Sequence, residues 1–528
     1  MQNVSQSWKD IHKQTLLNES FVEISLDIAD PDAMKDAIPS DNGSEYISDT
    51  LEVTSEVNTP VIHYGTLEQN GWVLDNSSKI IPINDYKDGG YIGDALSNDE
   101  GVFVEKIPTI TIGFSKEYEN HIPGITISWG TAYNEYAEHF IVTAYKDSDI
   151  VAQTEVVDNK SMKTIVTLDI ANYNRIEVQI LRWCLPNHRA RVDEIFMGWH
   201  KIYTKTDLFS YSHKQTGDPI STSLPKMEIK FSVNNVDGSY NPYNPQGMSK
   251  YLIERQEIKT RYGLKKNDNT IEWVDGGVFY LSEWYAKQNG ISADFVARDL
   301  LEFMSENYKD DITTITERSL YALAEQVLTK AEIPLNSDGT VKWYIDDSLK
   351  SIYTTAPLPD DTIANCLQMI ANAGKCTIYP DRKGMLCIVP VNNELTDYSV
   401  DSFNSYSKAE ITLSKIIKRV VVKVYSYSES GGIATTDVVK DINSIGETIV
   451  VTNPLITKEE QAVDLCEWIS NYIKNRMTVR SDCRPDVRLD TFDVITNKNE
   501  YGSNNVMVTD IELNFNGAFH GIVEGKVI

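Results

Sequence analysis

The most constraining feature of this sequence is a long alternation of apolar and polar residues near its C-terminus. One set of alternate positions is mostly apolar: Met507, Thr509, Ile511, Leu513 and Phe515. The positions between them are Val506, Val508, Asp510, Glu512 and Asn514, and Asn516-Gly517 follows directly. Alternation is typical of a strand with one buried face, and Asn-Gly favours a type I′ turn in which both residues have positive φ. We therefore predict a hairpin whose second strand is 518–528, with Asn516 and Gly517 as structural turn residues.

A helix is predicted shortly before this hairpin. Thr457 and Glu460 have the spacing of a capping box, and apolar residues recur at helical spacing from Ala462 to Ile473. We assign the helix to 458–475. Extended segments follow around Thr478 and Val494, so the helix is expected to belong to a closing β-domain, 396–528.

The region 51–203 reads as a series of short strands separated by turns. The predicted strands are 71–74, 109–114, 124–129, 140–145, 163–168, 175–181 and 191–197. Strands at this spacing without helices indicate a β-sandwich of the jelly-roll kind. Gly89 to Gly93 lacks the spacing of a dinucleotide-binding loop and is interpreted as a sandwich loop.

The sandwich is expected to be an insertion in another β-domain. Residues 22–28 alternate like a strand before it, and β-type patterns resume after Thr204, so we predict a domain made of 1–50 and 204–301. A small α+β domain follows at 302–395, with helices at 317–331 and 361–373. The predicted fold class is mainly β with an α+β part: two β-barrel domains, the inserted β-sandwich and the α+β domain.

Composition limits the classes of function. The chain has 528 residues, enough for three or four domains, and a formal charge of −28 that would repel nucleic acid, so we predict no direct nucleic-acid readout. The six cysteines form no CxxC pair and are interpreted as buried free thiols. The sequence has no signal peptide and no apolar run of about 18 residues, so we predict no transmembrane segment.

Catalytic and metal-binding motifs are not found. Gly374-Lys375 lacks the other residues of a phosphate loop, and His188 and His200 are interpreted as independent surface or rim residues. Asn235 to Asn241 has oxygen-bearing side chains around a glycine but lacks the Glu of a calcium loop, so Asp237 and Gly238 are predicted to form a structural turn. We predict no catalytic residue, no metal and no cofactor.

Ligand chemistry, if present, is expected in the sandwich. Sugars bind to an aromatic face with planar polar groups around it, and the candidates are Trp183, Asn187, Arg189 and Trp72. Trp183 is placed in a loop before the last strand, whereas Trp129 and Trp199 are interpreted as core residues. The segment 185–195 is similar to the final strands of discoidin-like or carbohydrate-binding jelly rolls appended to phage tail proteins.

Two blocks of the sequence carry a family resemblance. The first comprises 225–242, 277–280 and 295–301, and the second comprises 462–476, 486–494 and 511–517. Together they resemble the baseplate hub or tail-tip proteins of tailed phages. The resemblance implies that 1–50 plus 204–301 and 396–528 are the two hub domains, and that three subunits form a homotrimer with a pseudo-sixfold ring for the tail tube.

The resemblance also implies a role and a location. We expect a structural virion protein at the tail tip or baseplate of a long-tailed phage (a siphophage, with a Gram-positive host) or a phage-like particle, assembled in the host cytoplasm. Expected partners are the distal tail protein, the tail tube, the tape-measure protein and other baseplate or fibre proteins. Because the hub-like strands run to Ile528, wall-degrading activity is expected on another chain.

Two alternatives remain open on sequence grounds. In the first, the sandwich binds a host cell-surface polysaccharide and the hub only displays it. In the second, a polysaccharide hydrolase lies in the sandwich or in 302–395. Paired acids such as Asp346-Asp347, Asp360-Asp361 and Glu459-Glu460 are abundant, but at least the last two pairs begin predicted helices.

Overall fold

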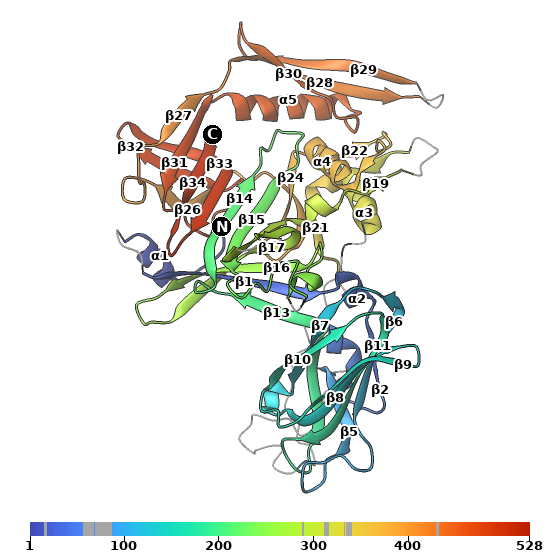
Figure 1. Ribbon diagram of the computed structural model, residues 1–528. Coiled ribbons are helices and arrows are strands. Elements are labelled where there is room, and N and C mark those ends of the chain that lie inside the picture. Colours follow the sequence, from blue (N-terminus) through green and yellow to red (C-terminus); the bar gives the residue numbers. More distant parts are fainter. Residues whose placement is uncertain are drawn as a thin grey trace.

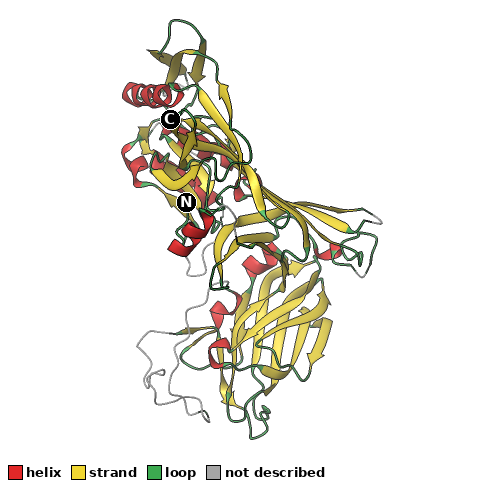
Figure 2. Ribbon diagram, turned by 90° about the vertical axis from the view of Figure 1, so that its left-hand side faces the viewer, coloured by secondary structure: helices red, strands yellow, loops and turns green. Residues whose placement is uncertain are grey.

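The computed structural model describes residues 1–14, 18–55, 68, 87–245, 247–287, 290–310, 316–331, 333, 340–428 and 432–528. The prediction of a mainly β chain with an α+β part is confirmed. Two views place the sandwich at one end of the molecule and the helix α5 (Glu459–Ile473) at the other, with the largest sheet between them (Figure 1, Figure 2).

The largest sheet has 13 strands and draws them from both predicted hub domains and from the sandwich range. Its main path runs β13 (Gly198–Tyr203), β1 (Ser20–Ala29), β16 (Glu257–Lys265), β17 (Ile271–Ala286), β18 (Ser292–Arg298), β15 (Lys226–Asn234), β14 (Leu208–Thr216), β33 (Gly502–Phe515), β34 (Phe519–Val527), β31 (Met477–Cys483) and β27 (Glu410–Leu413). A branch adds β32 (Val494–Asn499), which pairs with β33, and β26 (Leu395–Val400).

The expectation of two separate barrels is corrected by this order. The strands β14 and β33 pair antiparallel from Tyr211↔Phe515 to Thr216↔Asp510, so the sheet continues from one hub domain into the other. Among the described strands the path stays open and does not close into a barrel. We call the β14–β33 pairing the seam. Pairing across it satisfies edge backbone groups that two separate sheets would leave exposed.

The alternation predicted for the closing hairpin holds only in its second half. Ile511, Leu513 and Phe515 are buried, but Val506 and Val508 are buried as well and share one core with Ile511. The pairing with β34 shifts between Val508 and Asp510. A bulge adds one residue to one strand and so exchanges the two faces beyond it.

The hairpin connection also differs from the predicted turn. Phe515 pairs with Phe519, so three residues, 516–518, connect β33 to β34. Only Gly517 has positive φ there, at 107°, and the type I′ turn with positive φ at both Asn516 and Gly517 is therefore wrong. A three-residue connection with one glycine at positive φ is another common hairpin solution.

The sandwich consists of two packed sheets. One has the order β10 (Lys163–Ile170), β7 (Ile122–Trp129), β12 (Arg189–Phe196) and β5 (Tyr91–Leu96). The other has the order β2 (Ile38–Asp41), β6 (Thr109–Tyr118), β11 (Tyr173–Trp183), β8 (Ala137–Lys146) and β9 (Asp149–Val156). The predicted strand 71–74 lies outside the described residues, and the loop interpretation of Gly89 to Gly93 is wrong because β4 (Asp88–Gly89) and β5 run there.

The two crossings between sandwich and large sheet lie side by side. β2 ends at Asp41, before the predicted start of the sandwich at 51, but it pairs with β6 inside the sandwich. β13 (Gly198–Tyr203) lies within the predicted limit of 203, but it pairs with β1 in the large sheet. The strands therefore place both ends of the sandwich earlier in the sequence than predicted. Ala29 at the end of β1 is paired with Gly198 at the start of β13. The sandwich core draws only on residues between 33 and 197.

The α+β part has a core of its own that extends further than predicted. Its helices are α3 (Leu320–Lys330) and α4 (Ile363–Ala373), beside a sheet of β21 (Trp343–Ile345), β25 (Leu386–Pro390) and β24 (Cys376–Pro380). The same core includes α5 and the sheet of β29 (Ile433–Asp441), β28 (Ile417–Tyr427) and β30 (Glu447–Val451). The helix predicted at 458–475 therefore packs with the α+β core, not with the closing hub strands.

The remaining described elements are short. They are α1 (Gln6–His12), α2 (Pro31–Asp36), β3 (Ser48–Asp49), β19 (Asn307–Tyr308), β20 (Arg318–Ser319), β22 (Tyr353–Thr354), β23 (Asp361–Thr362) and five 3-10 turns: η1 (Thr50–Thr54), η2 (Thr131–Tyr133), η3 (Ser249–Tyr251), η4 (Leu300–Phe303) and η5 (Asp347–Ser351).

The predicted capping box of α5 is wrong. Lys458 is the N-cap and makes no side-chain cap, while Thr457 Oγ1 accepts from the Thr355 amide at 3.3 Å.

The insertion geometry predicts that the sandwich can be removed. Replacing 30–197 by a short Gly/Ser linker should leave a hub that unfolds cooperatively, because Ala29 and Gly198 are already paired and each part has its own core. The excised segment 30–197 should fold alone into β-structure. Circular dichroism and thermal melting check both parts, and an unfolded hub or an unfolded segment would contradict the division.

Candidate assembly interface

The segment 484–493, here called the junction segment, concentrates charged residues between the two strands β31 and β32. It contains Arg484, Asp486, Arg488, Asp490 and Asp493 within ten residues. Arg484, Asp486 and Arg488 are at most 8% exposed. Buried charges require partners, so this segment must bind other parts of the molecule.

Arg382 is the first of these partners. It lies in the turn between β24 and β25, and its Nε donates to Asp490 Oδ1 at 2.8 Å. Its two Nη groups donate to the backbone oxygens of Asp275, Val487 and Leu489 at 2.7–2.8 Å. Although burial opposes the charge, Asp490 raises the pKa of Arg382. One guanidinium thus joins the α+β hairpin to β17 and to the junction segment.

A polar network continues from this site into the seam. His213 Nδ1 and Tyr262 Oη are 2.8 Å apart, and Tyr262 Oη is 2.7 Å from Tyr211 Oη. Gln215 Oε1 accepts from the Thr491 amide at 3.1 Å, which extends the network to the junction segment. Burial, with the Arg382 charge second, lowers the pKa of His213 to about 3, so the imidazole stays neutral at neutral pH.

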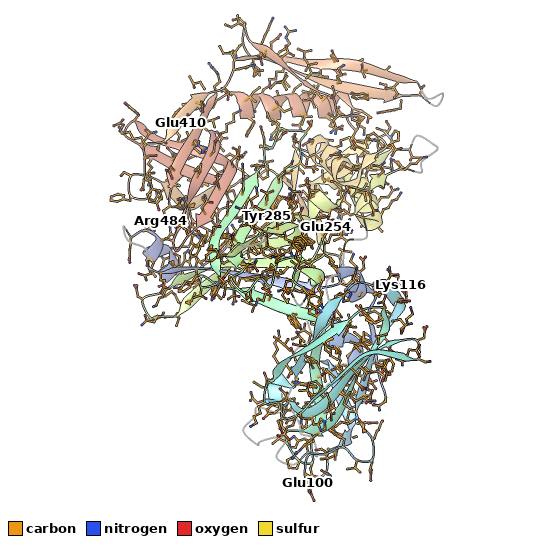
Figure 3. The ribbon with its side chains drawn as sticks, viewed as in Figure 1. Glu100, Lys116, Glu254, Tyr285, Glu410 and Arg484 are labelled. Carbon is orange, nitrogen blue, oxygen red and sulfur yellow. The ribbon has the colours of Figure 1, made fainter. Side chains whose placement is uncertain are left out.

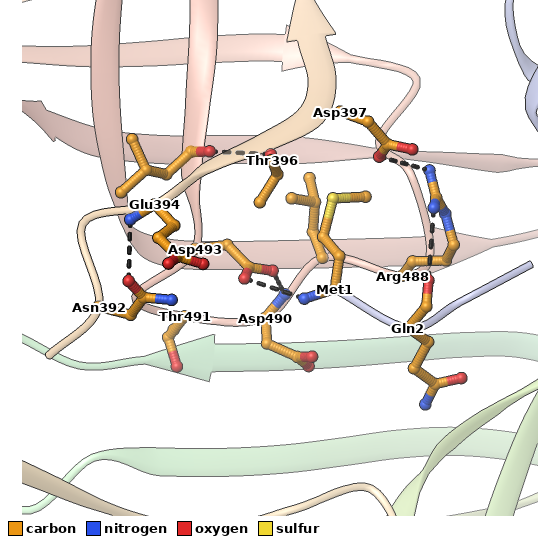
Figure 4. Close-up of polar contacts among 12 residues, drawn as sticks. Met1, Gln2, Asn392, Glu394, Thr396, Asp397, Arg488, Asp490, Thr491 and Asp493 are labelled. Carbon is orange, nitrogen blue, oxygen red and sulfur yellow. Dashed lines mark hydrogen bonds and ion pairs between the residues drawn. The ribbon is translucent and has the colours of Figure 1, made fainter. Parts of the chain in front are cut away.

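The N-terminal residues bind the other side of the junction segment (Figure 4). Arg488 forms a bidentate pair with Asp486, with Nε–Oδ1 at 3.0 Å and Nη2–Oδ2 at 2.6 Å. It also contacts Asp397 and the Gln2 carbonyl. The Met1 amino group lies 3.0 Å from Asp493 Oδ1. Arg484 donates to the carbonyls of His12 and Gln14 at 2.9 and 2.8 Å.

Replacing Arg382 by Met should destabilise the whole molecule. Asp490, which is 29% exposed, loses its ion-pair partner, and the carbonyls of Val487 and Leu489 lose the Arg382 donor. The Asp275 carbonyl still accepts from Gln2 Nε2 at 3.0 Å. We expect a loss of about 2 to 4 kcal/mol in the free energy of unfolding. Arg419 pairs with Asp441 and is 36% exposed, whereas Arg382 is 9% exposed. Arg419→Met should therefore lower the free energy of unfolding by less than about 1 kcal/mol. Denaturant unfolding measures both. Equal effects in the two variants would show that Arg382 does not hold the parts together.

A second buried charge lies where the first hub domain meets the α+β part. Asp299 is 3% exposed, and its carboxylate accepts from the amides of Met227 at 2.6 Å and Leu301 at 2.9 Å. It borders a cavity of about 240 Å³ together with Lys226, Glu228 and Arg298. Burial raises the pKa of Asp299 to about 7.

Asp299 should give stability a specific pH dependence. Because its pKa is raised in the folded state, its contribution is fully present below the unfolded value of about 4 and is lost as the pH rises towards 7. Asp299→Asn should flatten the fall in unfolding free energy between pH 4 and 7. Melting curves across this range test it, with Asp347→Asn as an exposed control. An unchanged slope in Asp299→Asn would contradict the assignment.

The predicted sugar-binding residues do not form an open site. Trp183 belongs to β11, is 1% exposed and donates from Nε1 to Glu135 Oε2 at 2.7 Å, so its placement in a loop is wrong. Asn187 Nδ2 donates to Asp99 Oδ1 at 3.1 Å, and Arg189 forms an ion pair with Glu45 at 2.8 Å. Trp72 lies outside the described residues.

A buried ionic cluster occupies this part of the sandwich instead. His188 is 4% exposed and its Nδ1 lies 3.0 Å from Glu135 Oε1, so the prediction of a surface or rim histidine is wrong. Arg191 pairs with Glu135 at 3.1 Å and also with Glu68. The predicted strand 191–197 begins at Arg191, but no sequence signal shows that this arginine is buried. The cluster links β12 to the residues after β7.

The remaining predicted positions have structural partners. Trp129 is fully buried and bonds Thr164, Trp199 is half-buried in β13, and His200 Nδ1 lies 2.6 Å from Asp27 Oδ1. Gly238 has φ 68°, and Asp237 Oδ1 accepts from the Ser239 amide at 3.1 Å. Within the described ranges, no three His, Cys, Asp or Glu side chains form a group that could hold a metal ion.

An apolar patch lies at one open edge of the large sheet. Among the strands that the structure describes, β27 pairs only with β31, and all four of its residues are exposed. Ile411 and Leu413 are 52% and 64% exposed, and Phe403 and Tyr406, which precede this strand in the sequence, are 74% and 59% exposed. We call these four residues the edge patch, and Figure 3 labels Glu410 beside it. An unpaired edge with exposed apolar side chains is typical of a protein contact.

Comparison with solved structures gives a consistent class of matches. The chain is similar to the 43 kDa tail protein of prophage MuSo2 from Shewanella oneidensis (12% identity, TM-score 0.41, 62% of this chain and 95% of the other). It is also similar to a tail protein from Neisseria meningitidis MC58 (9% identity, TM-score 0.43, 62% of this chain and 94% of the other). A third similar structure is prophage tail protein gp18 from Listeria monocytogenes EGD-e (11% identity, TM-score 0.39, 62% of this chain and 91% of the other).

These matches describe a likeness to phage tail proteins. With TM-scores below 0.5, they do not by themselves assign a fold or a role to this chain. No protein-family model and no curated protein matches the sequence. None of the helices in the described parts of the chain has the length and apolar character needed to cross a membrane.

Proposed function

We propose that this protein is a structural component of a phage or phage-like tail, acting as a baseplate hub at the tail tip. The observation that carries the proposal is the seam. The first sequence block that resembles hub proteins ends at 301 and contains β15, and the second begins at 462 and contains the end of β33. The strand β14 pairs with both β15 and β33, and so joins the two blocks in one sheet. A rigid body built in this way suits a mechanical role better than a catalytic one.

The proposed partners follow from this role. Three copies would form a homotrimeric ring that docks to the tail tube and contacts the distal tail protein, the tape-measure protein and other baseplate or fibre proteins. The location would be the virion tail tip of a siphophage with a Gram-positive host, after assembly in the host cytoplasm. The edge patch supports a contact between copies, because its apolar side chains are exposed and one edge of β27 is unpaired at the end of the described sheet.

The two alternatives find less support in the geometry. For the glycan-binding sandwich, Trp183 is buried and both Asn187 and Arg189 are bonded to other sandwich residues. For a hydrolase, Asp361 accepts from the Thr362 amide and from Asn365 at the start of α4, and Asp346 accepts from the Ser348 amide at a 3-10 turn. These carboxylates therefore serve helix starts.

The ring predicts a mass and a sensitive surface. Light scattering of the purified protein should give about three times 59.6 kDa. Leu413→Lys should reduce this to a monomer without lowering the melting temperature, because the residue is 64% exposed and a buried lysine would oppose association. Ile433→Lys, equally exposed on β29, is the control. A stable dimer, or a trimer unaffected by Leu413→Lys, would contradict the proposed contact.

A further inference from the structure

A groove of about 370 Å³ crosses the outer face of the large sheet at the seam. Its floor is formed by serines on neighbouring strands: Ser232 of β15 pairs with Ser210 of β14, and Ser212 of β14 pairs with Asn514 of β33. Tyr285 of β17 and His520 of β34 lie on either side of this floor. We call this the seam groove, and its volume lies in the range of small-ligand sites.

Ser232 supplies a hydroxyl on the floor of this groove. The residue is 8% exposed and lines the groove. Its hydroxyl has no hydrogen-bond partner within the part of the chain that the structure describes. A hydroxyl that is reachable from a groove is bonded to water in the free protein, and the hydroxyl of a ligand can replace that water.

The charge of the groove favours a neutral ligand. Lys230 and Asp294 are its only charged lining residues among those described, and they have opposite signs. Lys230 also forms an ion pair with Glu228 at 2.8 Å. On a chain with a formal charge of −28, this balance disfavours an anionic ligand and gives a cationic ligand little specific attraction.

The other lining groups match the chemistry of a sugar. Tyr285 is 57% exposed and offers a ring face, and Figure 3 labels it on β17 near the middle of the molecule. His520 is exposed at the opposite side, and Asn514 and Asn516 add planar amides. Ring faces contact the apolar side of a sugar, while amides and hydroxyls bond its hydroxyl groups.

We propose that the seam groove binds a neutral oligosaccharide. The sugar would lie across β17, β18, β15, β14 and β33, with one ring against Tyr285 and its hydroxyls bonded to Ser232 and Asn514. This site is on the hub sheet and is separate from the sandwich residues considered above. The inference stands on the groove alone and does not depend on the proposed ring.

The test uses the full chain and two neutral probes, chitotetraose and cellotetraose, with tetragalacturonate as an anionic comparison. Calorimetry or ligand-observed NMR at millimolar sugar should detect binding of at least one neutral probe and no binding of the anionic one. Tyr285→Ala should weaken it roughly 10-fold. Tyr501→Ala, at 90% exposed and outside the groove lining, should leave it unchanged.

Ser232→Ala provides an independent readout, since it removes the hydroxyl without adding bulk. It should also weaken sugar binding, while leaving the melting temperature unchanged. If neither neutral probe binds, or if binding survives both Tyr285→Ala and Ser232→Ala, the proposal is wrong. If no sugar binds and Tyr285→Ala instead alters the mass in solution, the groove is a protein contact.

Discussion

The Arg382 guanidinium is the interaction on which the relative positions of the domains depend. It reaches from the α+β hairpin to a carbonyl of β17 and to two carbonyls and one carboxylate of the junction segment. Because a guanidinium is planar and always charged, four acceptors around it fix orientation as well as distance. The seam, the polar network of Tyr211, Tyr262 and His213, and the N-terminal contacts all lie next to this one group.

Local elements could be predicted from sequence because their signals are local. Alternation marked most strands of the sandwich, and helical spacing located α3, α4 and α5 within three residues. The second half of the closing hairpin followed its pattern, but the bulge after Val508 did not, because a bulge depends on the partner strand and not on residue type. The same limit explains the turn at Asn516 and Gly517.

Long-range relations could not be predicted, and the polar residues show why. No local pattern indicates a partner for Arg488, yet it bonds the carbonyl of Gln2, 486 residues away. By residue type Trp183 is a candidate for sugar binding and His188 a surface or rim residue, but Glu135, about 50 residues earlier, accepts from the indole and bonds the imidazole. A side chain's role depends on which distant group reaches it, and a single sequence does not record that pairing.

The position of the two crossings to the sandwich determines how the molecule would carry a mechanical load. Ala29 and Gly198 are paired neighbours, so a pull on the sandwich draws β1 and β13 in the same direction and does not separate them. The force passes instead to the ladder between β1 and β16, which is paired from Ser20↔Leu264 to Leu26↔Ile258 and would be loaded in shear. Shear strains all hydrogen bonds of a ladder together, whereas peeling breaks them one at a time. A force applied to the sandwich therefore acts along the strands of the large sheet, the direction in which the ladder of hydrogen bonds resists separation best.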